Sequence, residues 1–168
     1  MPDTDDLATM VRVDNDYIET NFSRLLSHDP VSVWSALTEE GNLPLWLAPG
    51  TIDMWEGGAA KIKFTDSGIV IDSTVTALDP GHLIEYSWSA PGEPLRPLRW
   101  QLSAAPDGLS TRVDLTLSTP ASEDTARTAA GWEAHLEMLA AALEGVPIKF
   151  PFERFKAARE AYKARVPA

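Results

Sequence analysis

Residues able to do chemistry are sparse in this sequence, and none has the spacing of a familiar catalytic or metal motif. There is no cysteine, which excludes disulfides, thiolate nucleophiles and cysteine metal ligands. The three histidines, His28, His82 and His135, lie in unrelated segments and lack the His/Asp/Glu spacing of a metal site. The nucleophile elbow, the phosphate-binding glycine loop and the dinucleotide fingerprint are also missing from the sequence. We therefore expect no metal and no cofactor, and we assign no catalytic residue.

His135 is the titratable residue best placed to act on a ligand. It follows Trp132 by three positions and precedes Leu136 by one, which puts it at the margin of an apolar helix face. An imidazole titrates near neutral pH, so the ring could act as a hydrogen-bond partner or proton carrier in a pocket. The alternative is a half-exposed helix histidine without a function, which is the more common situation.

Aromatic residues are the second candidate feature, because six tryptophans in 168 residues exceed what a core of this size requires. A tryptophan can line a pocket while its N–H orients a ligand, although plain core packing is the alternative for each one taken singly. The predicted ligand-binding residues are Trp34, Trp46, Trp55, Tyr86, Trp88, Trp100, Trp132, His135, Leu136 and Leu139.

Five polar side chains on predicted strands could mark the polar end of a ligand if they pointed inward. They are Glu85, Arg99, Gln101, Arg112 and Asp114. An inward charge is costly unless it is paired, so such a residue would be informative. The ordinary alternative is that these side chains face solvent and pair across neighbouring strands.

A helix predicted over residues 122–143 is the element that must position the candidate residues. Trp132, Leu136, Leu139 and Leu143 follow one another at steps of four, three and four, the spacing of one helix face. At about 1.5 Å per residue the helix is roughly 33 Å long, enough to cross six or seven strands about 4.8 Å apart. Because a long helix against a curved sheet tends to leave a space, we expect a ligand pocket between them.

The segments before this helix predict an antiparallel sheet interrupted by two short helices. The expected strands are 17–26, 51–55, 59–64, 69–78, 82–89, 95–104 and 109–118, and the expected short helices are 30–41 and 42–47. Asp29-Pro30 is typical of a helix start, and glycine- and proline-containing turns separate the strands. Residues 1–15 are acidic and are expected to form a loose arm ahead of a main domain over 16–145.

Charge divides the chain into an acidic body and a basic extension over residues 146–168. The extension has six Lys or Arg against two Glu, a net +4, which leaves −15 for the rest of a chain whose total is −11. An acidic body disfavours nucleic acid and anionic membranes as partners. Phe152, Phe155 and Tyr162 give the extension an apolar helical stripe, so we expect it to pack on its own domain or on the partner in a homodimer. The acidic start MPDTDD is unlike a secretory signal, and we expect a cytoplasmic protein.

Taken in order, these segments resemble the activator of Hsp90 ATPase homologue 1-like family of the START/Bet v 1-like (SRPBCC) superfamily. The matching motifs are PVSVWSALT at 30–38, the Trp-bearing segment 43–49, Gly57-Gly58, Asp79-Pro80 followed by LIEYSW, and Gly131-Trp132 with Leu136 and Leu139. The resemblance covers about residues 17–143. It implies an α+β helix-grip fold, in which a long C-terminal helix packs across a curved antiparallel sheet of six to seven strands. Leu47 stands where many members have a second tryptophan, and the run 117–120 lacks the histidine that many members have.

Three functions are compatible with this sequence. The leading hypothesis is binding of a small apolar or aromatic ligand between the long helix and the sheet. The second is a cyclase, dehydratase or hydrolase acting on such a ligand, with His135 or an inward carboxylate as acid or base. The third, implied by the resemblance, is a co-chaperone that stimulates an Hsp90-type ATPase. Two convergent ionisable groups in a pocket would favour the enzyme over the simple binding protein.

Overall fold

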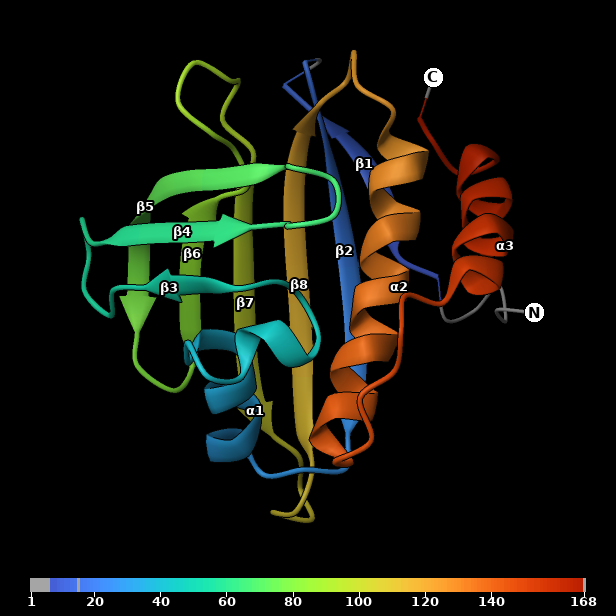
Figure 1. The fold of residues 1–168 in the computed structure, drawn as a ribbon. Helices are drawn as coiled ribbons and strands as arrows, with labels where there is room; N and C mark the ends of the chain where they lie inside the picture. Colours follow the sequence, from blue (N-terminus) through green and yellow to red (C-terminus); the bar gives the residue numbers. More distant parts are fainter. Residues whose placement is uncertain (1–6, 15, 168) are drawn as a thin grey trace.

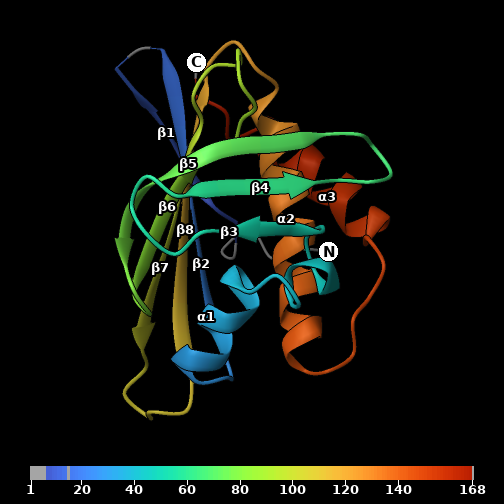
Figure 2. The same cartoon turned by 60° about the vertical axis from the view of Figure 1, so that its left-hand side comes forward.

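An eight-stranded antiparallel sheet is the frame of the computed structural model, which describes residues 7–14 and 16–167. The strand order is β1-β2-β8-β7-β6-β5-β4-β3, and the helices lie on one side of the sheet (Figures 1 and 2). The strands are β1 (Thr9–Val13), β2 (Tyr17–Leu26), β3 (Gly50–Ile52), β4 (Ala59–Lys63), β5 (Val70–Asp79), β6 (Leu83–Ser87), β7 (Pro97–Ala104) and β8 (Thr111–Pro120). The helices are α1 (Pro30–Thr38), the short 3₁₀ helix η2 (Leu43–Leu45), α2 (Thr125–Leu143) and α3 (Phe152–Lys163).

The predicted helix-grip architecture is confirmed, with the long helix α2 packed across the sheet. β5 bends the sheet, because its pairing with β6 slips between Val75 and Ala77 and such an irregularity increases local twist. As a result β3 and β4 curve round toward α2 (Figure 2). Asp124 caps the start of α2 by accepting a hydrogen bond from the Arg127 amide, and Gly145 follows its end with a φ of 78°.

β1 corrects the expectation of a loose arm over residues 1–15. It pairs with β2 from Thr9 opposite Asn21 to Val13 opposite Tyr17, and the two preceding residues, Leu7 and Ala8, are buried in the core. A five-residue strand among acidic residues is too short to show a clear alternation of apolar and polar residues. Its conformation depends on pairing with β2. Residues 1–6 and residue 15 of the expected arm lie outside the described part of the chain.

The basic extension folds back on its own domain, where α3 lies alongside α2 (Figure 1). Arg154 pairs with Glu137 at 3.0 Å, and Arg159 pairs with Asp124 at 3.0 Å. The apolar stripe is only partly buried, since Tyr162 is enclosed whereas Phe152 remains 63% exposed. Docking on its own domain was one of the two expected arrangements, and the homodimer stays a prediction. In the described part of the chain, no helix is both long and apolar enough to cross a membrane.

Candidate functional site

An aromatic cluster fills the space between α2 and the sheet. Its members are Trp46, Phe64, Tyr86, Trp88, Trp100, Trp132 and His135. Trp132 of α2 lies at its centre, with ring centroids 4.9 Å from Trp88 and 5.9 Å from Trp100. Most of the ring pairs have edge-to-face or tilted geometry, which favours aromatic contacts beyond simple burial. Side chains of the protein therefore occupy much of the space in which the sequence predicted a pocket.

Most of the predicted ligand-binding residues meet in or beside this cluster. Trp46, Tyr86, Trp88, Trp100, Trp132 and His135 belong to it, and Leu136 and Leu139 are buried in the adjoining core. Trp34 is half-buried against the same core without joining the network of ring contacts between described residues. Trp55 is 60% exposed in the β3–β4 connection, so it does not line the interior. The sequence alone could not distinguish these two tryptophans from the others, because residue type does not show whether a side chain is buried or exposed.

His135 is held as a neutral hydrogen-bond acceptor at the edge of the cluster. Its Nδ1 lies 3.1 Å from the backbone oxygen of Trp46. A carbonyl oxygen can only accept, so Nδ1 carries the proton and Nε2 is left as an acceptor. Burial lowers the pKa of His135 below the usual histidine value of 6.5, which favours this neutral form. Nε2 has no hydrogen-bond partner among the described residues, and it is not one of the fully enclosed polar atoms.

Three aromatic rings contact the His135 imidazole. Phe64 lies 5.8 Å from it, Trp132 5.9 Å and Phe150 5.6 Å, measured between ring centroids. Phe64 and Phe150 were missed by sequence reasoning. Phe64 follows the end of β4, and Phe150 lies in the linker between α2 and α3, so neither belongs to a periodic apolar pattern. The result is an imidazole acceptor in edge-to-face or tilted contact with three aromatic rings.

α1 and η2 fix the carbonyl that orients His135. The Trp46 indole N–H donates to the Ala36 carbonyl at 2.7 Å, which ties the end of η2 to α1. Trp46 also packs edge-on against Trp100 of β7, with ring centroids 5.9 Å apart. Because both its side chain and its backbone are held, Trp46 presents a fixed acceptor to α2. The Trp46 backbone oxygen thereby sets the tautomer of His135, because the hydrogen bond to one ring nitrogen decides which nitrogen carries the proton.

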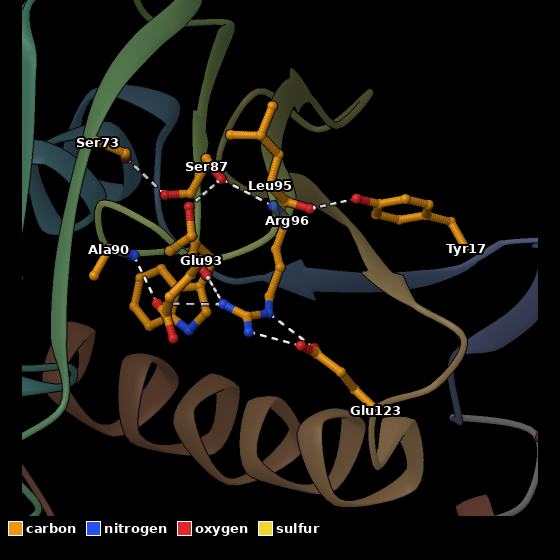
Figure 3. Close-up of polar contacts among 10 residues, drawn as sticks. Tyr17, Ser73, Ser87, Ala90, Glu93, Leu95, Arg96 and Glu123 are labelled. Carbon is orange, nitrogen blue, oxygen red and sulfur yellow. Dashed lines mark hydrogen bonds and ion pairs between the residues drawn. The ribbon is translucent and has the colours of Figure 1, made fainter.

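A polar network ties the loop after β6 to the approach of α2, and Figure 3 shows its side chains. Arg96 donates to both carboxylate oxygens of Glu123, from Nε at 2.8 Å and from Nη2 at 2.7 Å. The hydrogen bond to Glu123 and the charges of Glu123 and Glu93 raise the pKa of Arg96 further. Its Nη1 also donates to the Trp88 backbone oxygen at 3.2 Å. This bidentate arrangement fixes the loop directly beside the aromatic cluster.

The serines of the same network have partners already. The hydroxyl oxygens of Ser87 and Ser89 lie 2.6 Å apart, and Ser87 Oγ accepts from the Arg96 amide at 2.9 Å. The Ser73 hydroxyl donates to the Ser87 backbone oxygen at 2.7 Å, and the Tyr17 hydroxyl donates to the Leu95 oxygen at 3.0 Å (Figure 3). No histidine pairs with these serines in the described residues, so the network has the features of a loop anchor.

A second buried polar group, Glu133, lies on a different face of α2. Its side chain is 1% exposed and accepts from Arg24 at 2.5 Å and from the Tyr162 hydroxyl at 2.5 Å. Arg154 approaches it at 3.4 Å. Glu133 and His135 are two positions apart, so they do not share a helix face. Glu133 therefore joins α2 to β2 and α3 and takes no part in the aromatic cluster.

The five polar strand residues do not supply a polar end to the cluster. Glu85 pairs with Arg99 at 2.8 Å across neighbouring strands, and Arg112 pairs with Asp114 at 3.3 Å along one strand. These residues and Gln101 alternate with the buried residues of β6, β7 and β8, which places them on the outer face. His28 pairs with Glu144 at 3.0 Å, and His82 is exposed. Within residues 7–14 and 16–167 no group of three potential metal ligands occurs.

Two hollows lie at the margins of the molecule. One, of about 470 Å³, lies between the end of β2 and the last turns of α2, with Leu25, His28, Ala141 and Ile148 among its lining residues. The other, of about 400 Å³, lies at the β3–β5 edge of the sheet. None of the ten predicted ligand-binding residues lines either hollow. Most of those residues instead meet in or beside the aromatic cluster.

Family membership follows from a family-model match over more than half of the chain. The model for activator of Hsp90 ATPase homolog 1-like proteins matches residues 27–144, from just after β2 to just after α2. The chain belongs to this family. No protein with curated function matches this family member.

Solved structures agree on the fold of this Hsp90 ATPase activator 1-like chain. CalU16 from Micromonospora echinospora is 19% identical, with a TM-score of 0.73 over 96% of each chain. The protein encoded by BPP1335 from Bordetella parapertussis is 26% identical, with a TM-score of 0.72 over 94% of this chain and 90% of that one. EF2215 from Enterococcus faecalis, a protein of unknown function, is 20% identical, with a TM-score of 0.72 over 94% and 91%. The helix-grip fold is common to all of them.

Proposed function

We propose that this family member binds a small, neutral aromatic molecule that carries a hydroxyl or N–H group. The observation that carries the proposal is the His135 imidazole, held as a neutral acceptor by Trp46 and surrounded by the rings of Phe64, Trp132 and Phe150. A ligand ring would pack against Phe64 and Trp88 beside the imidazole, and its donor would bond to Nε2. Apolar walls with one placed polar group are typical of small-molecule sites.

The rim of the aromatic cluster is the part that a ligand can reach. Trp46 and Trp100 are enclosed at its base, whereas Phe64, Trp88 and His135 are each partly exposed. We therefore assign ligand contact to these three residues and a supporting role to the buried tryptophans. This narrows the ten sequence candidates to two, Trp88 and His135, and adds Phe64.

Charge favours a neutral ligand over an anion. The cluster contains no Lys or Arg, and the neighbouring Arg96 is already engaged by Glu123. Burial also disfavours protonation of His135, so the imidazole is not a cation that could pair with a carboxylate. A phenol-like donor satisfies the one open acceptor without bringing a charge into an apolar site.

Isothermal titration calorimetry with matched probes tests the proposal. The probes are 2-naphthol, which has a ring and a donor, naphthalene, which has the ring alone, and 2-naphthoate, which is an anion. We expect 2-naphthol to bind about fivefold more tightly than naphthalene, because one hydrogen bond contributes about 1 kcal/mol. 2-Naphthoate should bind most weakly of the three.

His135→Phe keeps an aromatic ring and removes the acceptor, so it should abolish the preference for 2-naphthol over naphthalene. Trp55→Ala, at an exposed tryptophan, is the matched control and should leave all three affinities unchanged. Equal binding of 2-naphthol and naphthalene to the wild type would contradict the role of His135. Failure of every aromatic probe to bind would reject the binding function.

Native mass spectrometry of protein purified from its own host can then identify a co-purified ligand. The enzyme and co-chaperone alternatives stay untested predictions.

A further inference from the structure

A linker between α2 and α3 places one aromatic side chain directly on the proposed site. Phe150, in the linker 146–151, lies 5.6 Å from His135 between ring centroids. On its other side it contacts Phe152 at 5.1 Å and Phe155 at 5.6 Å. The Phe150 ring thus lies between the proposed ligand site and the start of α3. The family model ends at residue 144, before this linker begins.

The linker is fixed at both ends and weakly held in its middle. At its start the Val146 amide donates to the Ala141 oxygen at 3.0 Å, and at its end the Phe155 amide donates to the Pro151 oxygen at 3.0 Å. Between them, residues 147–150 form no hydrogen bond with any other described residue. The segment is therefore held by side-chain contacts, those of the Phe150 ring and of Ile148 among them. Such a segment can move without unfolding the elements on either side.

α3 itself is firmly docked, which restricts the motion to the linker. Tyr162 is buried and bonded to Glu133 at 2.5 Å, and Arg159 pairs with Asp124 at 3.0 Å. Pro147 and Pro151 flank the segment and limit its conformations. A displacement of Phe150 away from His135 is then a local change between two fixed helices. The neighbouring Phe152 side chain is 63% exposed, so an aromatic ring of this region is already in contact with solvent.

We infer that Phe150 determines ligand size and access at the His135 site by occupying the place that the ring of the ligand takes. The inference rests on the proposed function. In the absence of ligand, the phenylalanine ring packs on the imidazole as the ligand ring would, but it brings no donor to Nε2. A planar aromatic molecule with a hydroxyl or N–H group displaces it by offering both the ring contact and the hydrogen bond.

Phe150→Ala and its matched control Phe152→Ala test the inference with 2-naphthol as the probe. Phe152 also contacts Phe150 and Phe155, but it makes no ring contact with His135. If the site is open about a tenth of the time, removing the competing ring should tighten 2-naphthol binding about tenfold. Phe152→Ala removes one ring that packs on Phe150 but leaves Phe150 in place, so its affinity should change much less than that of Phe150→Ala. Stopped-flow association should level off at high probe concentration for the wild type and rise linearly for Phe150→Ala.

The outcomes separate this inference from the proposed function. Equal affinities of the wild type and Phe150→Ala would overturn the role of Phe150 and leave ligand binding by His135 intact. Weaker binding by Phe150→Ala would also overturn it, because Phe150 would then be a wall that contacts the ligand. Absence of 2-naphthol binding to every variant would reject the proposed function and this inference together. Phe150→Leu, which keeps apolar bulk without the ring, should fall between the wild type and Phe150→Ala and is the fallback if alanine disturbs folding.

Discussion

The hydroxyl of Tyr162 donates a 2.5 Å hydrogen bond to the carboxylate of Glu133 and accepts one of 2.8 Å from the Ala8 amide. Both side chains are buried, so α3, the middle of α2 and the segment before β1 meet at one oxygen atom. Burial and the nearby carboxylate raise the pKa of Tyr162, and the hydroxyl remains a donor throughout the neutral range. The basic extension is therefore joined to the helix-grip core by buried bonds as well as by surface charges.

Tyr162→Phe should destabilise the fold by about 1–3 kcal/mol, because it leaves buried partners unsatisfied while it keeps the ring. Urea denaturation followed by circular dichroism measures the change. Tyr17→Phe is the matched control, since it deletes an exposed hydroxyl bonded to the Leu95 oxygen and should cost less than about 1 kcal/mol. Equal losses in the two variants would mean that the bond to Glu133 contributes nothing beyond a surface hydrogen bond.

Trp132→Ala should cost about 3–5 kcal/mol, because it removes the ring at the centre of the aromatic cluster and leaves a cavity. Trp55→Ala, at the exposed position, should change stability by no more than about 0.5 kcal/mol. Thermal and urea unfolding of both variants give the comparison. A small effect of Trp132→Ala would show that α2 is not packed on the sheet through this residue.

Gly131→Ala should stabilise the protein by about 0.5–1 kcal/mol. Gly131 lies in the interior of α2, and a methyl group added there meets no atom within 4 Å. Alanine loses less backbone entropy than glycine on entering a helix, and here it gains no clash. Gly145→Ala is the opposite case, because a φ of 78° disfavours any side chain and should cost about 1–2 kcal/mol. A melting temperature that fell in Gly131→Ala would contradict the space seen around this residue.

Stability should decrease as the pH falls below about 6.5, the ordinary pKa of histidine, and ligand binding should decrease at a lower pH, around the lowered pKa of folded His135. Burial lowers the pKa of His135 in the folded state, so the unfolded chain takes up the proton first and gains relative stability. The loss ends once the pH passes the lowered folded pKa. Binding of 2-naphthol falls as His135 protonates, because protonated Nε2 can no longer accept a hydrogen bond. An NMR titration of the His135 ring gives the direction directly, and His135→Phe should lose this part of the pH dependence.

The sequence was sufficient to predict the fold because its strongest patterns belong to elements buried on one face. The helix-period spacing of Trp132, Leu136 and Leu139 predicted α2, and the strand expected over residues 82–89 contains β6. β1 escaped prediction because five residues do not show a period. Its pairing with β2 is a tertiary interaction that no local pattern records.

The candidate site was predictable only in part. Its tryptophans and His135 were identifiable by residue type, but type alone could not show that Trp55 faces solvent. Phe64 and Phe150 reach His135 from a hairpin and a linker, where side-chain direction depends on how the chain is folded around them. Glu133 resembles a solvated helix position in the sequence, yet α3 and β2 enclose it. Placement of such residues is set by packing between distant segments.

The hydrogen bond between the Ala8 amide and the Tyr162 hydroxyl can form only after nearly the whole chain has been synthesised. The two residues are 154 positions apart, so a ribosome releases β1 long before its partner hydroxyl exists. Long-range closure of this kind slows folding. Until α3 emerges, the Glu133 carboxylate lacks the Tyr162 hydroxyl as a partner, and the segment before β1 lacks the hydrogen bond from Ala8 to Tyr162. A nascent chain stalled before Tyr162 should accordingly be more sensitive to protease at its N-terminal strand than the released protein is.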